Sequence, residues 1–225
     1  MSSVILPAQN LQPVPLQGLN VFIITWALAS YIIVMAITPG PNNVLLAASG
    51  VNYGLRRTLP MTLGIALGGG FHCFVSMLFF GQLFDWMAVI RLPIAVAGCI
   101  YLLWLAWHIY RAGAPEEGES SQPLTFMQAA LFQWINPKAW VMMLNMAALF
   151  MPVDGPVLWH ALQIGSADAL VSYPCVLLWA WMGDRLRLAL QNPLHLQCFN
   201  SVMGGLLALT ALWLLYDELR VLLEA

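Results

Sequence analysis

Charged side chains are scarce in this chain of 225 residues. Asp, Glu, Lys and Arg make up 8% of it, whereas soluble domains average about 25%. Hydrophobic residues make up 61%, compared with about 45–50% in soluble domains. So few charges cannot cover the surface of a soluble protein of this size. The composition therefore excludes a soluble domain and predicts an integral membrane protein that contacts the lipid bilayer.

Other absences exclude further classes of function. The net charge of −2 and the pI of about 6.0 leave no basic face, which argues against a nucleic-acid partner. The four cysteines form no Cys-x-x-Cys pair, so we expect neither a redox nor a metal site, and no cofactor. The sequence has no Gly-x-Ser-x-Gly, His-Glu-x-x-His or Walker motif, so it predicts neither an enzyme nor an ATP-driven pump. Residues 1–17 contain no Lys or Arg, which is atypical of a signal peptide.

Long apolar segments make up most of the sequence. A bilayer core about 30 Å thick requires roughly 20 apolar residues in a helix. The segments that meet this requirement are residues 19–38, 58–81, 87–110, 124–151, 157–182 and 199–216. The first, third and fifth loops between them contain five Arg residues, against two on the opposite side. We therefore expect these loops in the cytoplasm and both termini in the periplasm.

Two of the six segments contain residues that cannot continue a regular helix. The first segment runs into Pro39-Gly40-Pro41-Asn42-Asn43, and the fourth is interrupted at Asn136-Pro137. Pro39 and Pro137 are 98 residues apart, and two further apolar segments follow each of them. An ordinary proline kink in a membrane bundle is the alternative interpretation.

The matching breaks divide the chain into two halves. We predict a loose N-terminal extension (1–18), a first three-helix half (19–110), an acidic solvated linker (111–123) and a second three-helix half (124–225). Three spans in each half give the halves opposite orientations. The expected fold is therefore all-α, with six transmembrane helices in two inverted three-helix repeats and with helices 1 and 4 interrupted. Inverted repeats with interrupted helices in matching positions indicate the binding site of a transporter.

The chemistry of the breaks indicates a substrate class. Unwound backbone must face protein or water rather than lipid, so each break predicts a polar pocket. The half-helix that starts near Pro41 presents N–H groups that suit a carboxylate. The carbonyl groups that end the preceding half-helix suit an ammonium group. The two ends together match a zwitterion, so we expect amino acids to bind there.

Three polar residues inside the spans are candidates for function. Asp168 lies mid-span, where an acid costs about 2.5–3.5 kcal/mol, so we expect proton coupling or ammonium recognition, or else a structural pair with Lys138. Lys138 follows the second break, opposes the helix dipole and needs an anion or a carbonyl group nearby, unless it snorkels. The anion could be Asp168 or a substrate carboxylate. His72 is either a proton relay or a core histidine with its hydrogen bonds satisfied.

Small residues at helical spacing predict close helix packing. Gly64-x-x-x-Gly68 permits two helices to approach closely, and it also permits a homodimer. We expect Gly98, Gly204 and Gly205 to act in the same way.

The sequence resembles the LysE/RhtB amino-acid exporter family. The similar stretches are Ile37-Thr38-Pro39-Gly40-Pro41-Asn42-Asn43 with Gly54-x-Arg56, Gly98-Cys99-Ile100-Tyr101-Leu102-Leu103-Trp104-Leu105, Asn136-Pro137-Lys138, and an acid in the fifth span at Asp168. The resemblance covers residues 19–216 and motifs in four spans. The stretches 101–109 and 132–136 resemble the cysteine and O-acetylserine exporter branch, whereas residues 1–18 and the turn at 151–154 depart from the family pattern.

This resemblance implies a bacterial inner-membrane exporter of small amino acids, driven by proton exchange. The residues it implies for the site are Pro39, Gly40, Pro41, Asn42, Asn43, Asn136, Pro137 and Asp168, to which the residue chemistry adds Lys138 and His72. The alternatives are a passive channel for amino acids or other small solutes, and a membrane assembly subunit without transport activity.

Overall fold

The computed structural model describes residues 25–112, 122–152 and 155–224. The predicted extension (1–18) and most of the predicted linker (111–123) lie outside these residues. The described residues form α-helices and no β-strand, which confirms the predicted all-α class.

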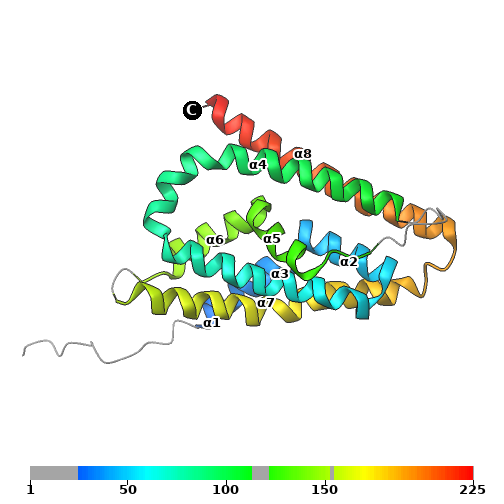
Figure 1. The fold of residues 1–225 in the computed structure, drawn as a ribbon, viewed down its shortest axis with the longest axis horizontal. Helices are drawn as coiled ribbons and strands as arrows, with labels where there is room; N and C mark the ends of the chain where they lie inside the picture. Colours follow the sequence, from blue (N-terminus) through cyan, green and yellow to red (C-terminus); the bar gives the residue numbers. More distant parts are fainter. Residues whose placement is uncertain (1–24, 113–121, 153–154, 225) are drawn as a thin grey trace, which may run out of the picture.

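Each predicted half contains two short helices followed by two long ones. In the first half these are α1 (Trp26–Ile37), α2 (Pro41–Tyr53), α3 (Leu55–Leu78) and α4 (Phe80–Arg111) (Figure 1). In the second half they are α5 (Phe126–Ile135), α6 (Pro137–Phe150), α7 (Val157–Arg187) and α8 (Pro193–Glu224).

Both predicted breaks are present. The axes of α1 and α2 are bent by 57° at the first break, and α6 starts directly after Asn136 at the second. Pro41 and Pro137 each take the first position of the following helix, where the missing N–H group costs nothing. The sequence spacing paired Pro39 with Pro137, but the structure pairs Pro41 with Pro137, because these two prolines start their half-helices.

Four of the described helices, α3, α4, α7 and α8, are long and apolar enough to cross a membrane. The bent pair of α1 and α2 makes a fifth candidate. The predicted segment 124–151 falls short, because the second break divides it into helices of 10 and 14 residues. The structure therefore supports a multi-pass membrane protein with four or five candidate spans among the described residues.

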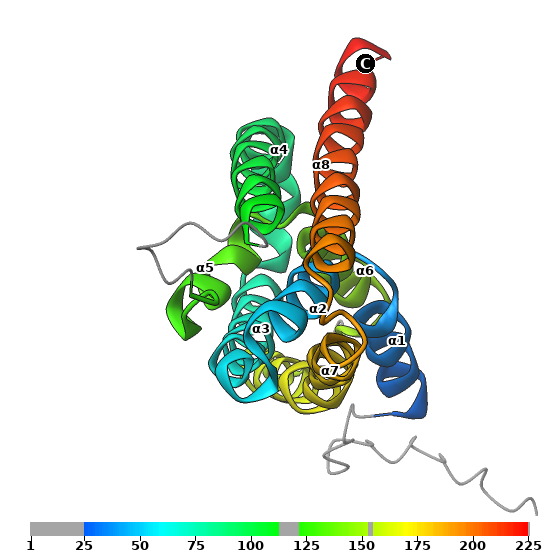
Figure 2. The same cartoon turned by 90° about the vertical axis from the view of Figure 1, so that its right-hand side faces the viewer.

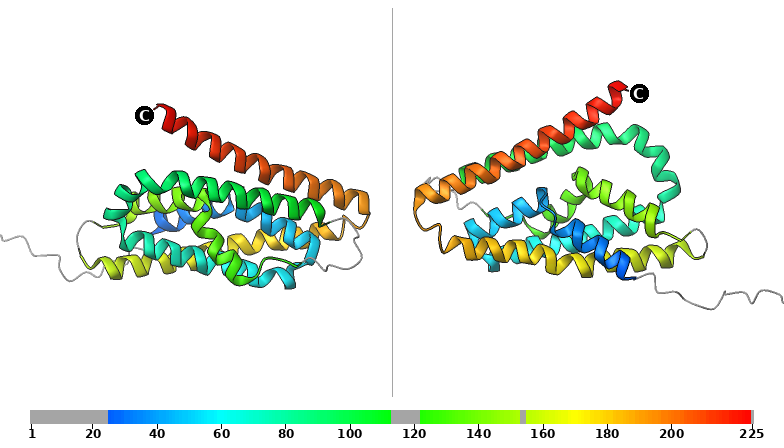
Figure 3. Two further views of the ribbon diagram at one scale, coloured as in Figure 1. Left: turned by 45° about the horizontal axis from the view of Figure 1, so that its top comes forward. Right: turned by 180° about the vertical axis from the view of Figure 1, so that it is seen from behind.

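The helices of one half pack against those of the other. The last helices, α4 and α8, lie side by side along one edge of the molecule, and α3 packs against α7 on the other side (Figures 1 and 2). The short helices α2 and α6 lie between these pairs of long helices, whereas α1 and α5 lie on opposite outer sides (Figures 2 and 3).

Most contacts between the halves have a counterpart when the halves are exchanged. The contact of α1 with α7 corresponds to that of α5 with α3, and the contacts of α2 with α7 and α8 correspond to those of α6 with α3 and α4. The contacts of α4 with α5 and of α1 with α6 have no counterpart of similar extent. The counterparts also differ in extent, since α2 packs closely along α7 whereas α6 packs less extensively against α3.

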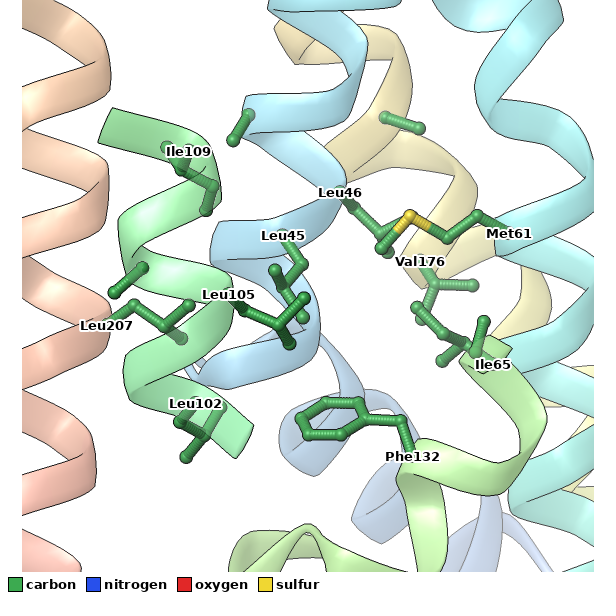
Figure 4. Close-up of a cluster of buried hydrophobic side chains, with 14 of the residues drawn as sticks. Leu45, Leu46, Met61, Ile65, Leu102, Leu105, Ile109, Phe132, Val176 and Leu207 are labelled. Atoms are coloured by element: carbon green, nitrogen blue, oxygen red, sulfur yellow. The ribbon is translucent and has the colours of Figure 1, made fainter. Parts of the chain in front are cut away.

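The main hydrophobic core surrounds α2. Leu45 and Leu46 lie at its centre, between the apolar side chains of α4 on one side and those of α3 and α7 on the other (Figure 4). The flanking side chains are Leu102, Leu105 and Ile109 of α4, Met61 and Ile65 of α3, and Val176 of α7. This packing fixes the position of the half-helix that follows the first break.

Glycines permit the closest helix contacts. A Cβ atom on Gly50 of α2 would lie 2.3 Å from the Ala180 carbonyl of α7, and one on Gly183 of α7 would lie 2.3 Å from the Ala47 carbonyl of α2. The C-terminal ends of α2 and α7 are thus in backbone contact. Asp184 strengthens this junction, since its Oδ1 accepts the N–H of Leu55 at the start of α3 (3.0 Å).

The predicted close approach at Gly64-x-x-x-Gly68 is confirmed. Both glycines face α5 of the same chain, where added Cβ atoms would lie 2.3 Å from the Phe126 carbonyl and 2.5 Å from Ala130 Cα. Gly98 and Gly204 likewise face neighbouring backbone, at Ile135 and Ala106. The prediction for Gly205 is wrong, because no atom lies within 4 Å of a Cβ added there.

Candidate functional site

A cavity of about 60 Å³ lies where the two helix breaks meet α3 and α7. It is large enough for several water molecules, since one needs about 10–15 Å³ by this measure. Six of the ten predicted site residues line it, namely Gly40, Asn42, Asn43, Asn136, Lys138 and Asp168. Residues from both halves, distant in sequence, therefore meet in one place. Pro39, Pro41, Pro137 and His72 do not line the cavity.

The carbonyl groups that end α1 are held by side chains of three other helices. Asn43 of α2 donates from Nδ2 to the carbonyls of Ala36 (2.9 Å) and Thr38 (2.8 Å). Trp179 of α7 donates from Nε1 to the carbonyl of Ile37 (3.3 Å). These bonds satisfy backbone groups that the break leaves without partners inside the helix.

Lys138 of α6 is the third of these donors. Its Nζ lies 2.7 Å from the Thr38 carbonyl and 3.4 Å from the Pro39 carbonyl. It forms no ion pair with Asp168, although both residues lie within the described ranges and line the same cavity. The sequence left Asp168, a substrate carboxylate and a backbone carbonyl open as partners of Lys138. In the structure the partners are backbone carbonyls.

Gly40 makes room for the lysine side chain. A Cβ atom at this position would lie 2.8 Å from Cδ and 3.0 Å from Nζ of Lys138. The Gly40 backbone itself is extended, with φ −176° and ψ −178°, so a larger residue could adopt its conformation. A larger residue here would thus displace the end of the Lys138 side chain rather than strain the backbone.

The two half-helix N-termini at the cavity differ. The N-terminus of α6 is capped by Asn136, whose Oδ1 accepts the N–H of Lys138 (3.2 Å). The N-terminus of α2 begins after Gly40 and has no side-chain cap. Of the two ends, only that of α2 therefore leaves its N–H groups without a competing side-chain acceptor.

Asn42 joins the two halves across the cavity. Its Nδ2 donates to Oε1 of Gln133 on α5 (3.0 Å), and Nε2 of Gln133 donates back to Oδ1 of Asn42 (3.3 Å). Gln133 also donates to the Ala129 carbonyl on its own helix (2.9 Å). This reciprocal amide pair fixes the start of α2 against the end of α5.

Asp168 is the buried acid of the cavity. It lies in the middle of α7, is 2% exposed, and its Oδ1 has no hydrogen-bond partner among the described residues. Ser172 lies one turn further along α7 and lines the same cavity. A carboxyl group without a protein partner inside a membrane span is available to a proton or to a bound ammonium group.

Three consecutive glycines of α3 make this arrangement possible. Gly68 faces α5 and Gly70 faces α7, where a Cβ atom would lie 2.6 Å from Cβ of Ala169. Gly69, between them, faces Asp168, with Oδ2 3.4 Å from the position of an added Cβ. The triplet thus brings two helices close to α3 and leaves space for the carboxyl group.

His72 lies outside the cavity in an aromatic enclosure. Its ring centroid is 4.6 Å from that of Trp134 and 4.4 Å from that of Trp140, residues on either side of the second break. The side chain is fully buried, and neither ring nitrogen has a hydrogen-bond partner among the described residues. His72 is thus a core residue, as one sequence alternative held, but its hydrogen bonds are not satisfied within the described part of the chain.

Two polar side chains of the cavity were not predicted from the sequence. Gln133 is a buried amide within the apolar run of α5, and a polar residue in such a run is a signal that could have identified it. Ser172 lies four residues after Asp168, the spacing that places two side chains on one face of a helix.

Comparisons with known proteins bear on this site. The family model described as LysE type translocator matches residues 33–218. Proteins named cysteine/O-acetylserine efflux protein from Escherichia coli (strain K12), Shigella flexneri serotype 5b and Shigella sonnei are each 35% identical to the chain over 114 residues. The matched segment covers 48% of this chain and 56% of each relative, so the chain spans about half the length of the curated relatives it matches. No solved structure matches it.

Proposed function

The chain belongs to the LysE type translocator family, and from this membership and the shared cavity we propose that it exports small amino acids or their derivatives across the bacterial inner membrane in exchange for protons. The observation that carries the proposal is the meeting of both helix breaks and Asp168 in one cavity. Relatives named as efflux proteins support a transporter rather than an enzyme.

The proposed architecture has six spans in two inverted repeats, with α5 and α6 together forming the interrupted fourth span. The repeated order of two short and two long helices supports this arrangement, as do the contacts that exchange between the halves. The excess of Arg in the first, third and fifth loops supports cytoplasmic loops and periplasmic termini.

The proposed substrate is a zwitterion bound at the first break. Its carboxylate lies at the uncapped N-terminus of α2, where the helix dipole favours a negative charge. Its ammonium group lies at the carbonyl groups of Thr38 and Pro39. Asp168 carries the exchanged proton, and His72 takes part in the same proton path from its enclosure behind the cavity.

Cysteine and O-acetylserine are the substrates to test first. The relatives in the comparison are named for them, and the matched segment supports the same class for this chain. Both compounds are small zwitterions, in keeping with a cavity of about 60 Å³.

Alternating access between the halves is the proposed mechanism. The backbone contact of α2 with α7 at Gly50 and Gly183, together with the cap that Asp184 provides, closes one end of the molecule. The counterpart contact of α6 with α3 is less extensive. We assign this arrangement to a carrier closed at the end that bears the first and fifth loops, which is the predicted cytoplasmic end.

Counterflow in proteoliposomes tests the proposal. Vesicles loaded with a mixture of small amino acids are followed for efflux with and without an imposed pH gradient. Gradient-dependent efflux of cysteine, O-acetylserine or a similar amino acid is the expected result. Efflux that ignores the gradient would establish a passive channel instead, and no efflux from folded protein would favour an assembly subunit.

A further inference from the structure

Lys138 makes the contact that the proposed function assigns to a substrate ammonium group. Its Nζ lies 2.7 Å from the Thr38 carbonyl and 3.4 Å from that of Pro39, and it is the only lysine in the chain. We propose that Lys138 is a tethered substitute for the substrate ammonium, which occupies the carbonyl site in the substrate-free carrier and leaves it when an amino acid binds. This inference rests on the proposed function.

The carbonyl site favours a positive charge in every state of the carrier, in addition to the neutral hydrogen bond that Asn43 gives the Thr38 carbonyl (2.8 Å). The carbonyl groups of Thr38 and Pro39 follow the last residue of α1, so they have no partner within the helix and carry part of the negative end of its dipole. Lipid offers no hydrogen-bond donor to them. An amino acid brings a cationic donor when it binds, and Lys138 supplies one when it does not.

The position of Lys138 allows its ammonium group to move away from the carbonyl groups of Thr38 and Pro39. It is half-buried, and the glycine at position 40 leaves its side chain a path across the backbone. Its Nζ contacts neutral carbonyl groups rather than a carboxylate, so one ammonium group can replace another there without a change of charge. The released lysine has acceptors in the same cavity, namely the substrate carboxylate and Oδ1 of Asp168, which lacks a protein partner.

This exchange has a consequence for transport. Lys138 belongs to α6 and the carbonyl groups to the residues that follow α1, so the contact joins the two predicted halves. A carrier with this contact can change conformation without substrate, as net export requires. In a carrier without it, Asn43 still gives the Thr38 carbonyl a neutral donor, but a positive charge reaches the site only with a bound amino acid. We therefore expect such a carrier to exchange one amino acid for another.

Lys138→Met and Lys138→Arg test the proposal in proteoliposomes, by measuring amino-acid exchange and net efflux separately. For K138M we expect exchange to continue with the half-saturating concentration lowered about threefold, because the internal competitor is gone, while net efflux falls about tenfold. K138R retains a cation and is expected to restore net efflux. Gly40→Ala, whose Cβ displaces the lysine side chain, is expected to reduce net efflux in the same way as K138M.

Other outcomes would overturn the proposal in recognisable ways. A raised half-saturating concentration in K138M would mean that the lysine only binds the substrate carboxylate. Unchanged net efflux in K138M would show that the carbonyl site needs no substitute. Absence of exchange in the unmodified protein would instead contradict the proposed function itself.

A measurement on the unmodified protein covers the case in which K138M does not fold. Because the chain has a single lysine, labelling lysine with 13C at Cε gives one NMR resonance. We expect O-acetylserine to shift this resonance and its N-acetylated form, which has no ammonium group, to leave it in place. Equal shifts with both compounds, or no shift with either, would contradict the proposal.

Discussion

Asn42 and Lys138 occupy the same position in their half-helices, and each reaches across to the opposite half of the molecule. Each follows the proline that starts its helix. Asn42 bonds to Gln133 near the end of α5, and Lys138 bonds to the Thr38 carbonyl at the end of α1. The two breaks are thus linked by one neutral and one charged contact, and the following predictions depend on the cavity between them.

Asp168→Asn is expected to reduce gradient-dependent efflux to the background of protein-free vesicles. An amide has the size and the hydrogen-bonding capacity to occupy the site but cannot exchange a proton at this position. Efflux with and without a pH gradient is the measurement, with gel filtration and thermal unfolding as controls for folding. Normal resistance of cells to a toxic amino-acid analogue in this variant would exclude the role of Asp168.

His72→Phe is expected to retain amino-acid exchange but to lose the dependence of net efflux on the pH gradient. Phenylalanine keeps the ring contacts with Trp134 and Trp140, so the packing survives while the ring nitrogens are removed. Net efflux that still follows the gradient would show that His72 has only a packing role.

The Asn42–Gln133 pair is expected to couple the two halves. In a double-mutant cycle of Asn42→Ala and Gln133→Ala, we expect a coupling energy of about 0.6 kcal/mol, the average for hydrogen bonds in membrane helices. Thermal unfolding of the single and double variants measures the coupling energy. Transport assays measure how each variant changes the half-saturating substrate concentration.

The Asn52–Asn200 pair is the matched control for this cycle. Its two reciprocal bonds, 2.8 and 2.9 Å long, join α2 to α8, and neither residue lines the cavity. We expect similar coupling there without a change in half-saturation. An equal change in half-saturation for both pairs would show that the Asn42 effect is only structural.

Gly183→Ala is expected to lower the free energy of unfolding by about 1–3 kcal/mol, as overpacking does. The added Cβ meets the Ala47 carbonyl, which cannot move away without shifting α2. Gly205→Ala is the control, since no atom lies within 4 Å of its added Cβ and alanine favours a helix over glycine. Thermal unfolding of the two variants in detergent gives the comparison.

Cys198 provides a test of orientation without any mutation. It is exposed at the start of α8, whereas Cys73, Cys99 and Cys175 are buried. Because the preceding loop is expected in the cytoplasm, a membrane-impermeant thiol reagent should label Cys198 in inside-out vesicles only. Labelling in right-side-out vesicles would reverse the proposed orientation, and Cys198→Ser identifies the labelled residue.

The sequence was informative about the breaks because proline and glycine act locally. The restricted φ of proline and its missing N–H group favour a helix end, and they do so at the ends of α1 and α5. Prolines at positions 60, 93 and 174, in contrast, lie inside continuous helices of the structure. A proline alone therefore does not identify a break. The two breaks differ from the three helical prolines in the residue before the proline, Gly40 at one break and Asn136 at the other.

The partners of the site residues could not be derived in the same way. The contact of Lys138 with Thr38 joins residues 100 positions apart, and that of Asn42 with Gln133 joins residues 91 apart. Such pairs depend on how α1, α5 and α6 pack together, which no local pattern encodes. The sequence consequently predicted Asp168 as a candidate but left open whether Lys138 would neutralise it.

The contacts between the halves resemble those that two copies of one chain make around a twofold axis, where α3 meets α7 and α4 meets α8 as equivalent partners. In a symmetric dimer every substitution appears twice, so a lysine at the second helical position would face its own copy across one cavity. Two ammonium groups so close together repel each other. In a single polypeptide the two equivalent positions can differ, and this chain has asparagine at one of them and lysine at the other. Two linked halves of similar packing can therefore line their shared cavity with different side chains, as the proposed asymmetric substrate requires.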